Sequence, residues 1–115
     1  MALAATLPKE EAKESEVETF IVTAYTNSVE DTGKRPGDKD YGITASGKRI
    51  EAGDCACPPE IPFGTKVYIP ELGRTYVCTD RGGAIKGKRL DIYLPSRSSV
   101  KRFGRQRLEV EIKTK

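Results

Sequence analysis

Short stretches rich in Val, Ile, Thr and Tyr, separated by glycine and proline, constrain the fold of this chain more than any other feature. Residues 88–94 show the pattern clearly, because three apolar residues alternate with Asp91 and Tyr93, as they do in a strand with one buried face. Similar runs occupy residues 19–26, 43–50, 66–70, 74–79 and 107–113. Eleven glycines and seven prolines in 115 residues also favour many turns over a helix bundle.

One short helix is expected between the last two strands. In residues 96–104, Ser96 is a suitable N-cap and Gly104 a suitable C-terminal stop. Six strands and one short helix, without an internal repeat, indicate a mainly β domain. A small closed barrel is the arrangement that leaves no strand edge exposed.

The first 18 residues are expected to be a flexible charged tail, and residues 19–115 the folded domain. The tail contains a short apolar start and then dense charge. It lacks the basic segment and long apolar segment of a complete signal peptide, so an export signal was either removed or is not needed. No run approaches the length of a membrane helix, and no membrane span is expected.

The net charge of +3 is unevenly distributed along the chain. Residues 97–107 contain five basic side chains, which form either a solvated surface or a region that attracts an anionic polymer. Nucleic acid is not expected as a partner, because no recognition motif or cluster of stacking aromatic residues accompanies these charges. The basic residues are Arg97, Lys101, Arg102, Arg105 and Arg107.

The chain contains no histidine, which excludes Ser-His-Asp and Cys-His catalysis and any histidine-ligated metal. Its three cysteines, Cys55, Cys57 and Cys78, lack the four-ligand spacing of structural zinc, and no metal is expected. A disulfide from Cys55 or Cys57 to Cys78 would suit an exported protein. The alternative is three buried free thiols.

The segment from Gly82 to Lys88 is close to the phosphate-binding pattern G-x-x-x-x-G-K-[ST]. However, Arg89 stands where the pattern needs a hydroxyl, and the residues that follow alternate as a strand, whereas a phosphate loop opens a helix. A nucleotide site is therefore excluded.

Two aspartates flank the same glycine-rich turn. Asp91 lies in the middle of an expected strand, where aspartate is disfavoured, and Asp80 ends the preceding strand. If the strands are neighbours, the two carboxyls face one cleft, and the pKa of one of them rises enough to make it a proton donor. The alternative is that Asp80 caps the turn and Asp91 pairs with Lys88 or Arg89.

The run TDRGGAIKGKRLDIY (79–93), with IPFGTKVYIP (61–70) and YGITASG (41–47), resembles the three-aspartate (3D) domain family of muralytic enzymes. The resemblance extends over about residues 20–113. That family is related to the catalytic barrel of membrane-bound lytic transglycosylase A and more distantly to expansins. The resemblance implies a six-stranded double-psi β-barrel with one short helix.

The activity that the resemblance implies is cleavage of the β-1,4 bond between N-acetylmuramic acid and N-acetylglucosamine, with a 1,6-anhydro product and no cofactor. One carboxyl group is sufficient for this reaction, because the C6 hydroxyl of the sugar is the nucleophile. The implied catalytic residues are Asp91, as general acid and base, and its neighbour Asp80. The implied substrate-binding residues, for which simple turn chemistry is the alternative, are Lys34, Thr44, Ser46, Gly47, Gly83 and Lys86.

One departure from the family pattern affects the functional expectation. The family has A-x-D-P-x-x-I-P-x-G-T, whereas residues 55–65 read CACPPEIPFGT, so Cys57 replaces an aspartate. Cys57 is expected to bond to Cys78 and brace the strand that leads to Asp80. The two remaining aspartates favour an enzyme, and Cys57 favours a non-catalytic, expansin-like module that binds or loosens the wall.

The expected partners are peptidoglycan glycan strands and anionic wall polymers. The expected location is extracellular or associated with the cell wall, and a phage-encoded origin remains open. The sequence does not predict the oligomeric state.

Overall fold

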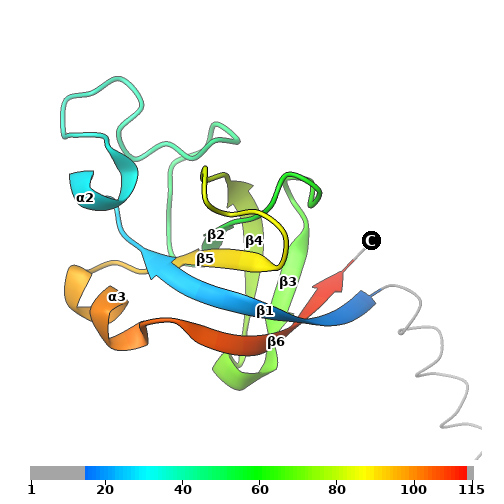
Figure 1. Ribbon diagram of the computed structural model, residues 1–115. Helices are drawn as coiled ribbons and strands as arrows, with labels where there is room; N and C mark the ends of the chain where they lie inside the picture. The colour runs from blue at the N-terminus through cyan, green and yellow to red at the C-terminus, as the bar shows by residue number, and fades with distance from the viewer. Residues whose placement is uncertain (1–14, 114–115) are drawn as a thin grey trace, which may run out of the picture.

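Six strands form a closed barrel in the computed structural model, which describes residues 15–113 (Figure 1). The strand order around the barrel is β1-β5-β2-β4-β3-β6, and β6 pairs again with β1. The expectation of a mainly β, six-stranded barrel with a short helix is confirmed. The strands are β1 (Ser15–Tyr25), β2 (Asp54–Ala56), β3 (Lys66–Ile69), β4 (Arg74–Asp80), β5 (Arg89–Tyr93) and β6 (Gln106–Lys113).

Two strand pairs are parallel, β1 with β5 and β2 with β4, and the other four pairs are antiparallel. Neither parallel pair is consecutive in the chain, and long connections cross one end of the barrel. The longest described connection, residues 26–53, includes the single helical turn α2 (Val29–Thr32). These connections form the walls of the cavity described below.

The alternation in the sequence sorts side chains between two apolar clusters. One face of the strands fills the barrel interior, where Val22, Val67, Leu90 and Val110 are fully buried. The opposite face carries a smaller cluster of Tyr25, Ala56 and Ile85. Asp91 belongs to the second face, because its neighbours Leu90 and Ile92 point into the interior.

Residues 43–50 were expected to be a short strand that runs into a turn, and the strand does not form. These residues make a turn closed by a single bridge between Ile43 and Arg49, because Gly47 adopts a φ of +96° and its N–H donates to the Thr44 carbonyl. The sixth strand forms instead at β2, in a stretch where the sequence analysis expected no strand. All three β2 residues are buried, so burial between β4 and β5 compensates for the weak strand pattern.

The expected tail falls partly outside the described residues, which begin at Ser15. Residues 15–18 pair with residues 110–113 of β6 and are the start of β1. The expected boundary at residue 18 therefore lies inside a strand, since the backbone of β6 supplies hydrogen-bond partners that composition alone does not reveal.

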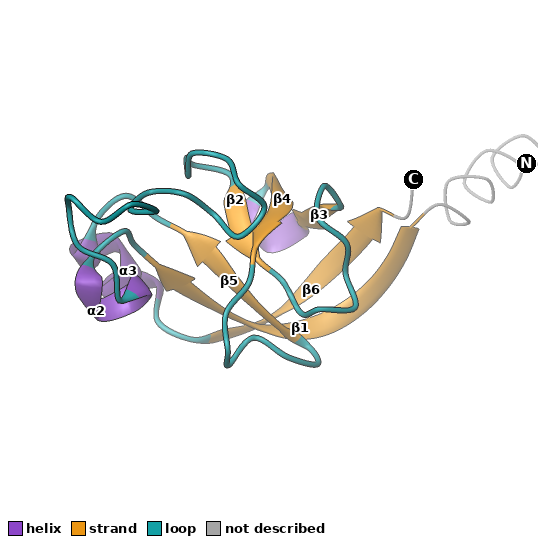
Figure 2. Cartoon of the chain, turned by 90° about the horizontal axis from the view of Figure 1, so that it is seen from above, coloured by secondary structure: helices purple, strands orange, loops and turns teal. Residues whose placement is uncertain are grey.

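The expected helix forms as α3 (Arg97–Phe103). The Ser96 hydroxyl accepts a hydrogen bond from the Ser99 N–H at 3.1 Å, and the helix stops at Gly104. In both views α2 and α3 lie at the same end of the barrel (Figures 1 and 2), where Arg97 of α3 forms an ion pair with Asp31 of α2 at 2.8 Å. No described helix is both long enough and apolar enough to cross a membrane.

Candidate functional site

A cavity of about 310 Å³ lies where the connections cross the end of the barrel. Its lining includes both aspartates identified in the sequence, together with Tyr25, Lys34 and Arg81. A larger and mostly apolar hollow of about 520 Å³ is lined by Phe20, Ile61 and Ile112, among others, and contains neither aspartate. The smaller cavity is therefore the candidate for chemistry that needs a carboxyl group.

Strand register brings the two aspartates together. Ala56 of β2 pairs with Asp80 of β4 on one side and with Asp91 of β5 on the other. A β-bulge between Cys55 and Ala56 shifts the register with β4, which is a common way to redirect side chains next to a functional site. Ala56, which pairs with both aspartates, also lines the cavity.

Both carboxylate oxygens of Asp80 are held by hydrogen bonds. The Tyr25 hydroxyl donates to Oδ2 at 2.8 Å, while the N–H groups of Ala45 and Arg81 donate to Oδ1 at 2.8 and 3.0 Å. Burial, and next the charge of Asp80, raise the pKa of Tyr25 far above its usual range, so the phenol keeps its proton and acts as a donor. Asp80 is thus fixed as an acceptor.

Asp91 has a different environment although it is the same residue type. Among residues 15–113, only the Thr23 hydroxyl donates to its carboxyl group, at 3.0 Å to Oδ1. Burial raises the pKa of Asp91, and the charges of Asp31 and Asp80 add to the rise, against the lowering effects of the Thr23 hydrogen bond and Arg89. A carboxyl group in a cavity with a raised pKa is the usual signature of a general acid.

The ion pairs of Asp91 that the sequence left open do not form. Lys88 pairs with Glu18 at 2.6 Å, and no described lysine or arginine lies within ion-pair distance of Asp91. Asp80 does accept the N–H of the next residue, as a turn cap would, but it also accepts hydrogen bonds from two distant segments.

Asp31 is a third carboxyl group at the cavity, and the sequence analysis did not identify it. Burial alone would raise its pKa, but hydrogen bonds from Thr26 and Arg97 produce a net lowering. Asp31 is therefore ionised, and its negative charge contributes to the raised pKa of Asp91.

The expected substrate-binding residues separate into three groups. Lys34 and Gly83 line the cavity beside the aspartates, and Lys34 Nζ donates to the Ile43 carbonyl at 2.9 Å. Thr44, Ser46 and Gly47 are not lining residues, but the turn that they form carries the Ala45 N–H to Asp80. Lys86 is exposed on the connection from β4 to β5 and lies outside the lining.

The sequence analysis did not identify Tyr25, Thr23 or Arg81 as site residues, because each has an ordinary structural explanation in the sequence. Tyr25 and Thr23 belong to a strand-like run in which aromatic and β-branched residues are expected. Their spacing of two positions, which places both side chains on one face of β1, is the signal that could have identified them as partners of Asp80 and Asp91.

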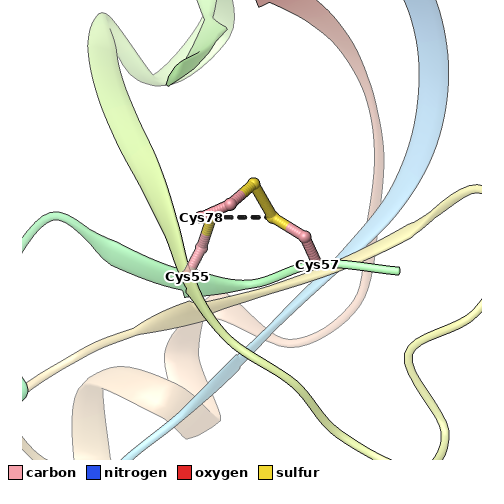
Figure 3. Close-up of side chains that lie close together, drawn as sticks. All are labelled: Cys55, Cys57 and Cys78. Atoms are coloured by element: carbon pink, nitrogen blue, oxygen red, sulfur yellow. Dashed lines mark hydrogen bonds between the residues drawn. A yellow bond between two sulfur atoms is a disulfide. The ribbon is translucent and has the colours of Figure 1, made fainter. Parts of the chain in front are cut away.

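The three cysteines meet in the barrel interior (Figure 3). Cys57 and Cys78 form a disulfide with a Cα–Cα distance of 5.7 Å, and the Sγ atom of free Cys55 lies 3.5 Å from that of Cys57. Burial, and then nearby Asp54, raise the pKa of the Cys55 thiol far above its usual range. Thiolate is the metal-binding form of cysteine. Two of the three sulfur atoms form the disulfide and the Cys55 thiol keeps its proton, so this group does not suit a metal ion.

The disulfide joins the residue after β2 to β4, two positions before Asp80. It is the pair that the resemblance suggested, and it replaces the alternative of three free thiols. It therefore braces the strand end that carries Asp80.

Comparison with known proteins identifies sequence relatives from one organism. The family model described as "3D domain" matches residues 55–114. The cell wall-binding protein YocH of Bacillus subtilis (strain 168) is 37% identical over 76 residues, which are 62% of this chain and 26% of the relative. The putative cell wall shaping protein YabE of the same organism is 32% identical over 101 residues, which are 84% of this chain and 23% of the relative.

Among solved structures, the lytic transglycosylase MltA from Escherichia coli is similar. One crystal structure has a TM-score of 0.50 and 26% identity over 61% of this chain and 26% of that chain. A second has a TM-score of 0.50 and 25% identity, with the same coverage. The chain thus spans about a quarter of the length of each of these proteins.

Proposed function

The chain belongs to the 3D domain family, and on this premise we propose that its barrel cleaves the glycan strands of peptidoglycan as a lytic transglycosylase. The observation that carries the proposal is the environment of Asp91. This carboxyl group lines the cavity, has a raised pKa, and receives a hydrogen bond from Thr23 alone among the described residues. It therefore has the properties of a general acid.

The proposed reaction uses Asp91 twice. Protonated Asp91 donates its proton to the glycosidic oxygen while the bond from that oxygen to C1 of N-acetylmuramic acid breaks. The C6 hydroxyl of the same sugar then bonds to C1, and the Asp91 carboxylate accepts the hydroxyl proton. The products are a 1,6-anhydro sugar and a free 4-hydroxyl group, and the enzyme returns to its starting state.

The geometry of Asp80 supports a single catalytic carboxyl group. Ordinary glycosidases need a second carboxylate that attacks C1 or activates water. Three hydrogen bonds already occupy the Asp80 oxygens, so Asp80 suits the role of holding Tyr25, Ala45 and the cavity wall in place. An internal nucleophile makes a second reactive carboxylate unnecessary.

Contacts to the glycan are proposed first for Lys34 and Gly83, since both line the cavity. Thr44, Ser46 and Gly47 are proposed to act through their turn, and Lys86 to contact a strand that extends beyond the cavity. Arg97 is occupied by Asp31, so attraction to anionic wall polymers falls to the exposed residues Lys101, Arg102, Arg105 and Arg107. A location outside the cell or at the wall follows from this proposal.

The test compares the wild type with Asp91→Asn on purified peptidoglycan, with the released sugars analysed by mass spectrometry. The wild type is expected to release anhydro-muropeptides, and the variant to be slower by at least about 100-fold, the usual contribution of a general acid. Glu109→Gln is the control, because this exposed carboxyl group on β6 lies outside the cavity. Products with reducing ends would contradict the mechanism.

A second candidate function is a non-catalytic module that binds or loosens the wall. It is favoured by Cys57, which replaces the aspartate of the family pattern and is locked in a disulfide, and by the names of the two relatives, a wall-binding and a wall-shaping protein. In the same experiment, this function predicts sedimentation with insoluble wall and no released sugar from either protein.

A further inference from the structure

We propose that Arg81, held against Phe63, forms a subsite beside the two aspartates that recognises a carboxylate attached to a sugar ring of the ligand. The inference rests on the proposed function for the kind of polymer. The subsite itself is argued from contacts and charges around Arg81.

The Arg81 side chain is fixed in position. Nη2 donates to the Ile61 carbonyl at 2.8 Å, and Nη1 donates to the carbonyls of Cys57 and Asp80, each at 3.3 Å. The ring of Phe63 stacks on the guanidinium, with its centroid 4.1 Å from Cζ. A ligand that meets this cation therefore does not have to immobilise a flexible side chain.

The charge of Arg81 is not neutralised by the protein. Among the described residues, neither Arg81 nor Lys34 has a carboxylate within ion-pair distance, whereas Asp31 is paired with Arg97. The cavity thus contains one carboxyl group suited to a reaction, Asp91, and two cations that lack an anionic partner among the described residues. Such a cavity suits a ligand that supplies its own negative charge.

The remaining donors of Arg81 suit a carboxylate. A guanidinium has five N–H donors, and the three contacts to backbone carbonyls use three of them. The remaining N–H groups and the planar shape match the two oxygens of a carboxylate better than they match a single hydroxyl.

Phe63 supplies the apolar part of the subsite. It is 44% exposed although it is a large apolar residue, and Arg81 covers one face of its ring. An exposed aromatic ring in contact with a residue that lines a polar cavity offers a surface for the C–H face of a sugar, and ligand sites usually combine apolar and polar groups in this way. The pair therefore suits a sugar ring with an acidic substituent.

In peptidoglycan, such a carboxylate has two sources. One is the lactyl group of N-acetylmuramic acid, which is free only where the stem peptide has been removed. The other is the end of a stem peptide. Arg81 is adjacent in sequence to Asp80 and lines the same cavity as Asp91, which favours the lactyl carboxylate close to the ring. A reaction that removes stem peptides would then have to supply the substrate.

The test measures the affinity of three matched oligosaccharides for the Asp91→Asn protein by calorimetry at low salt. The first has free lactyl carboxylates, the second carries the same groups as methylamides, and the third carries stem peptides. We expect the carboxylate form to bind about tenfold tighter than the amide, as loss of one charge-assisted contact predicts. Equal affinities for the acid and the amide would overturn the inference.

Single substitutions test whether Arg81 causes the difference in affinity between the carboxylate and the amide ligand. Arg81→Gln, in the Asp91→Asn background, is expected to bring the ratio of the two affinities to about one. Arg74→Gln, which removes an exposed cation outside the cavity, should keep the ratio unchanged. Phe63→Leu should weaken both ligands and preserve the ratio. The proposal of a lactyl subsite is wrong if Arg81→Gln leaves the ratio of acid to amide affinity unchanged, or if the oligosaccharide with stem peptides binds tightest.

The design remains informative if Arg81→Gln loosens the fold, because the acid and amide are compared on protein that retains Arg81. It also separates the inference from the proposed function. Discrimination between acid and amide without cleavage by the wild type would support the subsite and contradict the enzyme, and cleavage without discrimination would do the reverse.

Discussion

Asp80 and Asp91 show how neighbouring residues of one type acquire different roles. Three donors fix Asp80, while burial and the charge of Asp31 raise the pKa of Asp91 against the lowering effects of the Thr23 hydroxyl and Arg89. Separation of two carboxyl environments is a general way to divide acid–base work at one pH. The difference arises from Thr23, Tyr25 and Asp31, each more than 45 residues from the carboxyl group that it affects.

Replacing Thr23 with valine should shift the pH dependence of activity. The Thr23 hydrogen bond lowers the pKa of Asp91, so its loss raises that pKa further. Because the first step needs protonated Asp91, cleavage falls as pH rises through this pKa, and the alkaline limb of the profile should move to higher pH. Initial rates of sugar release at several pH values test this, and a limb that moves to lower pH would contradict it.

Asp91→Asn should stabilise the fold at neutral pH while it removes activity. The folded-state pKa is raised above its ordinary value of 3.8, so the folded state binds protons more tightly than the unfolded state. The contribution of Asp91 to stability is then fully present below pH 3.8 and is lost as pH rises through the folded-state pKa. The asparagine side chain carries no charge. The free energy of unfolding of the Asp91→Asn variant at pH 7 should therefore exceed that of the wild type by about 1 kcal/mol.

Urea unfolding of both proteins at pH 7 and at pH 3 provides the measurement. The difference in free energy of unfolding between the two proteins should be largest at pH 7. It should shrink at pH 3, where Asp91 of the wild type is protonated in both the folded and the unfolded state. A variant less stable than the wild type at pH 7 would show that the Asp91 charge is not a cost to the fold.

At the scale of the elements, the strongly alternating strands and the capped helix were predictable. Leu90 and Ile92 identify β5, and Ser96 and Gly104 bound α3, because these signals are local in sequence. β2 was not predictable, since its three residues are strand only through pairing with β4 and β5. Residues 43–50 show the converse, because β-prone residues yielded to turn geometry at Gly47.

The candidate site, like the fold, was predictable only where its signals are local in sequence. The glycine-rich connection and the resemblance identified Asp80 and Asp91, whereas Tyr25 and Asp31 depend on contacts between segments far apart in the chain. Arg81 was overlooked because it stands inside the motif and its lack of an anionic partner is visible only in three dimensions.

Removal of the disulfide should destabilise the domain without changing its strand order. The double variant Cys57→Ala/Cys78→Ala frees a loop with a sequence separation of 21 residues, which the loop-entropy estimate equates with about 3 kcal/mol. Chemical unfolding with and without a reductant tests this. The reductant should lower the stability of the wild type and leave that of the double variant unchanged, and equal effects on both would contradict a structural disulfide.

At the scale of the whole molecule, closure of the barrel isolates the interior from solvent. Cys55 is fully buried between β4 and β5 in the strand order, and its thiol has a strongly raised pKa. Local fraying of the exposed connections does not uncover it.

Alkylation of Cys55 should therefore report global unfolding. Iodoacetamide is expected to modify the native protein only at the rate at which the barrel opens, and denaturant should accelerate the reaction in parallel with unfolding measured by circular dichroism. Peptide mass mapping identifies the modified residue. Rapid labelling under native conditions, unaffected by denaturant, would show a local opening next to β2.

The hydrogen bonds that hold the site join the two halves of the chain, since Thr23 and Asp91 are 68 residues apart and Tyr25 and Asp80 are 55 apart. Contacts of such long sequence separation form slowly, and only after the loops between them have closed. No fragment or half-folded intermediate of this chain can assemble the acid and its supports. The proposed muralytic activity should therefore begin only when folding ends, and the rate per molecule of a weakened variant should measure the fraction that is folded.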